Sequence, residues 1–222
     1  MKIFEGGEGS GNFGHVGRPG QVGGSASQYT SLTTGEYLEL SEKYSFEKKY
    51  GTESLEGFFK LSDIGFYLGA KYTYVNSVLR KGNLTGEPLK AGYTNAVEAV
   101  DDLISIGVAE KNLLVYRGTE TAWDLKVGQE FEDKAFVSTS VSLKISSNFK
   151  DTLHQVFEIR VKEGTHVGYV GPTTHMEEEI ILPRNSKFRV TKITNRTPEN
   201  SDFFDGLSKY NKIEQYVELE LL

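Results

Sequence analysis

The stretch DLISIGVAEKNLLVYRG (residues 102–118) marks the place where the hydrophobic period of the chain changes. Apolar residues before Gly107 recur every three or four positions, which indicates a helix, whereas LLVYRG is a short apolar run typical of a strand. Gly107 itself is a helix stop signal. Because helical patterns precede this point and strand patterns follow it, the sequence predicts an α+β fold rather than alternating βαβ units.

Upstream of this stretch, residues 29–92 carry apolar side chains at helical spacing in GEYLELSEKYSFEKKY, SLEGFFKLSDIGFYLG and YTYVNSVLRKG. A further helix is predicted from Ala96 to Ile106. Asn95 and Glu98 are its expected N-cap pair. The buried stripe of this helix is expected to consist of Val97, Val100 and Ile104.

Downstream, seven short β-branched or aromatic runs are separated by turn residues. They are NLLVYRG, FEDKAFVSTS, QVFEIRVK, THVGYVG, EEIILPR, KFRVTKI and QYVELELL. Seven strands of this kind predict two packed, antiparallel-rich β-sheets, with the N-terminal helices covering them.

The composition of the 222-residue chain limits the classes of function. The net charge of −6 argues against a role in coating nucleic acid, because such proteins neutralise phosphates. The chain contains no cysteine and only four histidines, which leaves little from which to build a metal site, so no metal cofactor is expected. No apolar run reaches membrane-spanning length and the start MKIFEGGEG lacks a signal-peptide core, so we expect a soluble monomer without a membrane span.

Residues 1–28 are glycine-rich and are expected to form a flexible segment, with a single domain over residues 29–222. The segment is interpreted as a linker or arm. Its amino-acid sequence, GSGNFGHVGRPGQVGGS, also resembles a glycine-rich stretch of phage head-morphogenesis proteins, which suggests a phage or prophage origin.

Three polar clusters lie on or beside the predicted strands: Arg117, the STS sequence at residues 138–140, and the acids of HMEEEIILPR. Taken singly, each has an ordinary explanation as a solvated or cross-strand polar group. Strand alternation predicts that Glu177 and Glu179 share one face, with Glu178 on the other face towards solvent.

Taken in order, LLVYRGTE, DKAFVSTSVS and EEEIILPRNSKF resemble the R, S and E-x-E motifs of the arginine-specific mono-ADP-ribosyltransferases. The resemblance is greatest to the branch of binary-toxin enzymatic components and C3-like exoenzymes. It includes the flanks AVEAVDDLI and VFEIRVKEGTHVGYV, and YLGAKYTYVNSVLR resembles the family's helix before the NAD pocket. It extends from about residue 29 to the C-terminus.

The resemblance implies that NAD⁺ is the co-substrate and that a target protein supplies an arginine as the acceptor. Glu179 would stabilise the oxocarbenium-like transition state, with Ser138 hydrogen-bonding Glu179. Arg117 would bind the pyrophosphate with the fork geometry of its guanidinium. The other expected NAD contacts are Gly118 at the nicotinamide amide, Asn76 and Arg80 at phosphate or ribose, and Phe149 as a wall for the nicotinamide ring.

The role that the resemblance implies for Glu177 explains why the carboxylates are crowded together. An arginine acceptor is protonated and inert, so Glu177 would bind it, orient it and take a proton. The loop GPTTHM (residues 171–176) would contribute to target recognition.

Two other functions stay open at this point. The first is an NAD glycohydrolase on the same fold, with water as the acceptor. The second is a non-catalytic phage structural or adaptor module. The phage-like segment favours action in a bacterial host or delivery into a target cell.

Overall fold

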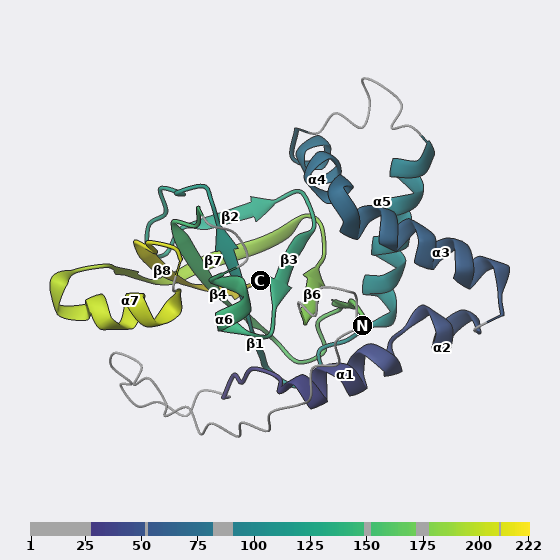
Figure 1. The fold of residues 1–222 in the computed structure, drawn as a ribbon, viewed down its shortest axis with the longest axis horizontal. Coiled ribbons are helices and arrows are strands. Elements are labelled where there is room, and N and C mark those ends of the chain that lie inside the picture. Colours follow the sequence, from purple (N-terminus) through teal and green to yellow (C-terminus); the bar gives the residue numbers. More distant parts are fainter. Residues whose placement is uncertain (1–27, 52, 82–90, 149–151, 172–177, 209) are drawn as a thin grey trace, which may run out of the picture.

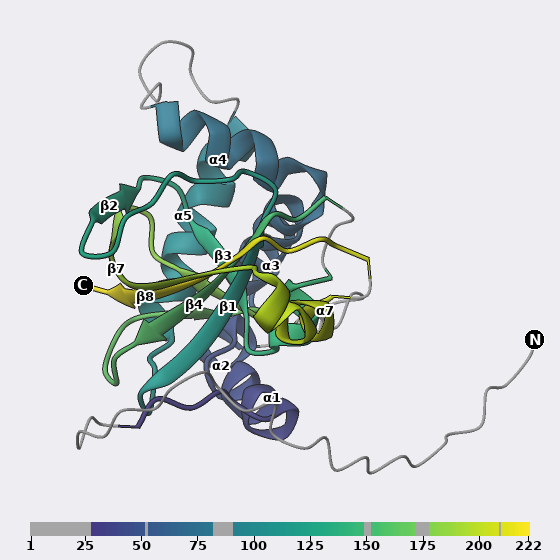
Figure 2. The same ribbon diagram turned by 90° about the vertical axis from the view of Figure 1, so that its left-hand side faces the viewer.

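The computed structural model describes residues 28–51, 53–81, 91–148, 152–171, 178–208 and 210–222. Helices occupy the first part and strands the second, so the predicted α+β class is confirmed. The N-terminal helices gather beside a twisted sheet, and the short C-terminal helix lies at the opposite end of that sheet (Figure 1, Figure 2).

Five helices and a π-helical turn precede the first strand in the described part of the chain. They are α1 (Thr34–Lys43), α2 (Phe46–Tyr50), α3 (Leu55–Phe66), the π-helical turn η1 (Tyr67–Lys71), α4 (Tyr72–Lys81) and α5 (Ala91–Ile106). Among the described residues after the first strand, two short helices and a 3₁₀ turn follow: α6 (Leu143–Ser146), the 3₁₀ turn η2 (Pro198–Asn200) and α7 (Ser201–Leu207).

The predicted N-cap of the helix before Gly107 is wrong, because Asn95 lies inside α5. The turn before Asn95 is already helical, and Tyr93 packs its ring against Phe66 at 5.3 Å and Tyr74 at 4.8 Å between centroids. These aromatic contacts between helices favour a longer helix than the local capping signal predicts. The predicted stripe of this helix is buried, as Val97, Val100 and Ile104 are at most 7% exposed.

The strands form one hydrogen-bonded sheet in the order β2-β7-β8-β4-β1-β3-β6-β5. Their bounds are β1 (Leu113–Thr119), β2 (Glu130–Asp133), β3 (Val137–Ser140), β4 (Gln155–Val161), β5 (Gly168–Tyr169), β6 (Glu179–Leu182), β7 (Ser186–Asn195) and β8 (Gln215–Leu221). All neighbours are antiparallel except β4 and β8, which are parallel.

The two sheets predicted from the sequence are joined into this single sheet at β1, which pairs with β4 along its length but with β3 through only Tyr116 and Ser140. The predicted run FEDKAFVSTS also divides into β2 and β3. The division follows from Asp133, whose Oδ1 accepts a hydrogen bond from the Ala135 amide at 3.0 Å and so turns the chain between the two strands.

Two large hydrophobic clusters fill the space on either side of the β3–β6 pair. One packs β1, β4, β7 and β8 against α1 and includes Phe157, Phe188 and Tyr169. The other joins α3, η1, α4 and α5 to the sheet through Phe136 and Ile181. The helical part therefore packs on the strands that carry the STS and E-x-E sequences. Among the described residues, none of the helices is both long enough and apolar enough to cross a lipid bilayer.

Candidate active site

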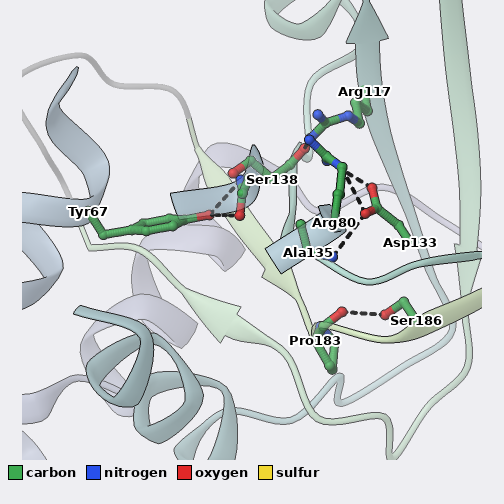
Figure 3. Close-up of polar contacts among 9 residues, drawn as sticks. Tyr67, Arg80, Arg117, Asp133, Ala135, Ser138, Pro183 and Ser186 are labelled. Carbon is green, nitrogen blue, oxygen red and sulfur yellow. Dashed lines mark hydrogen bonds and ion pairs between the residues drawn. The ribbon is translucent and has the colours of Figure 1, made fainter. Parts of the chain in front are cut away.

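Arg117 and Ser138 meet where β1 and β3 adjoin. The Arg117 Nη1 donates a hydrogen bond to the Ser138 carbonyl oxygen at 2.8 Å, and both residues are half-buried (Figure 3). Burial lowers the pKa of Arg117, and the neighbouring positive charge of Arg80 lowers it further, whereas Asp133 acts in the opposite direction. The guanidinium pKa starts so far above neutrality that the group remains a cation.

Glu179 joins this pair through the register of β3 and β6. Ser140 pairs directly with Glu179, and Ser138 pairs with Ile181. Because residues two apart on a strand share a face, the side chains of Ser138, Ser140 and Glu179 lie on the same side of this antiparallel pair. Ser138 is the serine neighbour of Glu179 that the sequence predicts, and the register adds Ser140 directly opposite Glu179.

Tyr67 and Asn76 lie on the same side of this strand pair, with the Tyr67 hydroxyl directed at Ser138 (Figure 3). Tyr67 is fully buried in η1, and its hydroxyl and the Asn76 side-chain amide hydrogen-bond at 3.1 Å. Burial raises the pKa of Tyr67 to about 12, and its ionisation is further opposed by Glu179 and eased by the Ser138 hydroxyl and Arg117. The Tyr67 hydroxyl is therefore a neutral group whose pKa depends on the charges of Glu179 and Arg117.

Arg80 of α4 reaches the sheet through a two-pronged contact with Asp133. Its Nε and Nη2 donate to the two carboxylate oxygens at 3.0 and 2.9 Å, and Asp133 is 7% exposed (Figure 3). This bidentate geometry fixes the plane of the Arg80 guanidinium, which would be lost with a lysine.

A cavity of about 210 Å³ lies beside these charged groups. Arg80, Arg117 and Asp133 line it together with aromatic side chains, among which are Trp123 and Phe157. Two guanidinium groups next to aromatic surface suit a ligand that combines phosphate with flat rings, which is the chemistry of a dinucleotide.

Gly118 has a packing requirement that the sequence did not reveal. A Cβ atom at this position would lie 2.3 Å from the Ser146 carbonyl oxygen and 2.5 Å from Leu153 Cδ1. The expected role of Gly118 was close approach to nicotinamide. The structure shows that the absence of a side chain also lets α6 pack against β1, next to Arg117.

The acidic stretch does not follow strand alternation throughout. β6 begins at Glu179, and Glu178 has the left-handed backbone angle φ +47°, which is uncommon for a residue other than glycine. The alternation argument therefore does not reach Glu177. Glu178, expected to face solvent, is half-buried, and its Oε1 accepts a hydrogen bond from Thr34 Oγ1 at 2.5 Å.

Several predicted features lie outside the described residues: Glu177, Phe149, residues 172–176 of the recognition loop and residues 1–27 of the glycine-rich segment. Conversely, Tyr67, Asp133 and Thr34 enter the site without having been predicted. Asp133 offered a usable signal, because it is an acid at the centre of an otherwise strand-like run. In the part of the chain that the structure describes, no cluster of three or more His, Asp or Glu residues could hold a metal ion.

Known proteins resemble this chain in sequence and in fold. A curated relative, the NAD(+)–arginine ADP-ribosyltransferase EFV of Enterococcus faecalis, is 28% identical over 139 residues, which are 58% of this chain and 28% of that protein. The chain thus spans little more than a quarter of the length of this relative.

Among solved structures, the Clostridium limosum C3 exoenzyme matches 88% of this chain and 98% of its own with a TM-score of 0.63 at 17% identity. The enzymatic component C2-I of the Clostridium botulinum C2 toxin matches 88% of this chain and 49% of its own with a TM-score of 0.62 at 20% identity. At these identities the likeness concerns the fold. The sequence model of the ADP-ribosyltransferase exoenzyme family matches residues 59–215, well over half of the chain, and the chain therefore belongs to the ADP-ribosyltransferase exoenzyme family.

Proposed function

We propose that the chain is a mono-ADP-ribosyltransferase that transfers ADP-ribose from NAD⁺ to an arginine of a target protein and releases nicotinamide. The contact between Arg117 and Ser138, on the strand that pairs with Glu179, is the observation that carries this proposal. It brings the R and S sequences together at β3, next to β6, the strand that begins with the last acid of E-x-E. The acceptor is inferred from the name of the Enterococcus faecalis relative and from Glu177.

The substrate would be held at its pyrophosphate by guanidinium groups. Arg117 is the main candidate, because it is a half-buried cation beside the cavity. Arg80 lines the same cavity and is a second candidate for phosphate or ribose. Asn76 is 4% exposed and bonded to Tyr67, which supports a role in holding the Tyr67 hydroxyl in place; its expected contact with NAD⁺ stays a prediction.

Glu179 would promote cleavage of the bond between nicotinamide and ribose. When this bond breaks, its electron pair moves to the nicotinamide nitrogen, and positive charge develops on the ribose C1′ and ring oxygen. A carboxylate fixed beside that carbon stabilises the charge as it appears. The position of Glu179 at the start of a buried strand supports this role, since packing limits its movement.

Glu177 would act on the acceptor. Its carboxylate would bind the arginine guanidinium by charge-assisted hydrogen bonds, and take one proton as a guanidine nitrogen forms its bond to C1′. In a glycohydrolase water would attack C1′ instead, so Glu177 would be dispensable. This difference separates the two enzymes experimentally.

The test compares NAD⁺ hydrolysis with transfer of labelled ADP-ribose to a small guanidine acceptor. Glu179→Gln should abolish both reactions, whereas Glu177→Gln should abolish transfer and retain part of the hydrolysis. Glu163→Gln is a matched control, because Glu163 is exposed and lies near the end of β1 remote from Arg117. Wild-type transfer by both variants would refute the proposed roles, and free ADP-ribose as the only product of the wild type would identify a glycohydrolase.

Residues 29–222 are proposed to form the catalytic unit, acting as a monomer, with residues 1–28 as an arm. The target protein would be met inside a cell, either the bacterial host of a phage or a cell into which the enzyme is delivered. Incubating biotin-labelled NAD⁺ and the protein with bacterial and animal lysates would identify the target as a labelled band. No labelled protein in either lysate, with activity on a free guanidine intact, would contradict a protein acceptor.

A further inference from the structure

The middle acid of the E-x-E sequence has an unusual conformation and a specific partner. Glu178 has φ +47°, a backbone state that non-glycine residues adopt only when their surroundings hold them in it. Its side chain accepts a hydrogen bond from Thr34 Oγ1, 144 residues away in the sequence, at 2.5 Å. Its carbonyl oxygen accepts a hydrogen bond from the Val141 amide at 3.2 Å. Both the side chain and the backbone carbonyl of Glu178 are therefore held by hydrogen bonds.

Helix α1, which begins with Thr34, also binds the backbone of Glu179. Tyr37, three residues after Thr34 on α1, is 2% exposed, and its hydroxyl donates to the carbonyl oxygens of Val170 and Glu179, the latter at 3.1 Å. Burial raises the pKa of Tyr37, and the negative charges of Glu179 and Glu178 raise it further, so the hydroxyl stays a proton donor. One turn of α1 thus contacts Glu178 and Glu179 together.

The first turn of α1 is itself fixed in place. Thr33 caps the helix and forms a capping box with Glu36. Glu36 in turn binds Lys111 Nζ at 2.5 Å, just before β1. The strand that carries Arg117 is therefore linked, through this turn of α1, to Glu178 and Glu179.

We propose that α1 positions the catalytic carboxylate, with Thr34 and Glu178 as positioning residues that act through Glu179. The Thr34–Glu178 hydrogen bond holds Glu178, directly before β6, in its left-handed state, and Tyr37 holds the carbonyl of Glu179. Together they direct the Glu179 side chain towards the face shared with Ser138. The inference rests on the proposed function, because it assigns Glu179 the role described above.

The experiment is a double-mutant cycle read by kinetics. Thr34→Val removes the donor and keeps the charge of Glu178, and Glu178→Ala removes the acceptor. Each single change should lower kcat for NAD⁺ hydrolysis by about three- to tenfold, the range expected for one charge-assisted hydrogen bond at a half-exposed site. KM for NAD⁺ should change by less than about twofold, because a positioning defect acts on the chemical step rather than on binding.

The double variant should be no slower than the slower single variant, because both changes remove the same contact. Thr34→Ser should restore wild-type kcat, and Glu178→Gln, which keeps an acceptor oxygen, should retain more activity than Glu178→Ala. Glu39→Gln is the matched control, since Glu39 is an exposed acid on the same helix. A melting temperature for each variant verifies that it is folded.

Wild-type kcat in Thr34→Val, additive losses in the double variant, or equal losses in Glu178→Gln and Glu178→Ala would overturn the inference. The last outcome would assign the effect to the charge of Glu178 itself. Failure of the proposed function is a different result, because the wild type would then neither cleave NAD⁺ nor modify a guanidine.

Discussion

Replacing Gly118 by alanine tests the packing beside Arg117. The new Cβ would lie 2.3 Å from the Ser146 carbonyl oxygen and 2.5 Å from Leu153 Cδ1. Ordinary contacts of this kind are roughly 3.4 Å or longer, so α6 or β1 must move by about 1 Å. Overpacking of this kind costs about 1–3 kcal/mol in free energy of unfolding. For a domain of this size, each kcal/mol corresponds to a fall in Tm of about 2–4 °C.

Thermal and urea unfolding of Gly118→Ala should therefore show a fall in Tm of roughly 2–12 °C, and KM for NAD⁺ should rise because Arg117 is displaced. Two other glycines supply controls. Gly206→Ala in α7 meets no atom within 4 Å and should be neutral or slightly stabilising. Gly107→Ala meets the Val167 carbonyl at 2.1 Å, away from Arg117, so it should lose stability without a change in KM.

Wild-type stability in Gly118→Ala would refute the packing argument. A loss of stability with an unchanged KM for NAD⁺ would show instead that Gly118 is needed only for the packing of α6, and that binding by Arg117 does not depend on this packing. The comparison with Gly107→Ala makes the second result interpretable, because both substitutions place a methyl group against a backbone carbonyl.

Two further changes test the buried and the exposed polar contacts. Tyr67→Phe removes the hydroxyl that is bonded to Asn76 and should cost about 1–3 kcal/mol in urea unfolding at neutral pH. This difference from the wild type should shrink between about pH 10 and 12, because burial raises the pKa of Tyr67 on folding and its contribution is lost as the pH rises through about 12; a pH-independent difference would contradict this effect of burial. The hydrogen bond from Lys111 lowers the pKa of Glu36 to about 2. Glu36→Gln should therefore be less stable than the wild type above pH 4.5, and this difference should disappear as the pH falls through about 2. Urea midpoints measured at several pH values would reveal it.

The fold class was predictable because it depends on a change of hydrophobic period that the sequence displays at Gly107. The number of strands was not, because the turn inside FEDKAFVSTS depends on the contact between Asp133 and the Ala135 amide. The start of α5 depends on the packing of Tyr93 against two other helices, and no local signal encodes that contact.

The candidate site divides in the same way. Arg117, Ser138 and Glu179 could be named because their sequences, taken in order, resemble the R, S and E-x-E motifs of a known family, although their roles stay predictions. Thr34, Tyr37 and Tyr67 could not be named, because they reach the site from helices far away in the sequence. The left-handed state of Glu178 was also hidden, since glutamate gives no indication of a positive φ.

The junction between β1 and β3 has a mechanical consequence. A single residue pair, Tyr116 and Ser140, connects five strands on one side of the sheet with three on the other. Such a seam is far more compliant than its neighbours, where four to seven registered pairs must stretch at once. Bending of the sheet is therefore expected to concentrate at the point where Arg117 contacts Ser138.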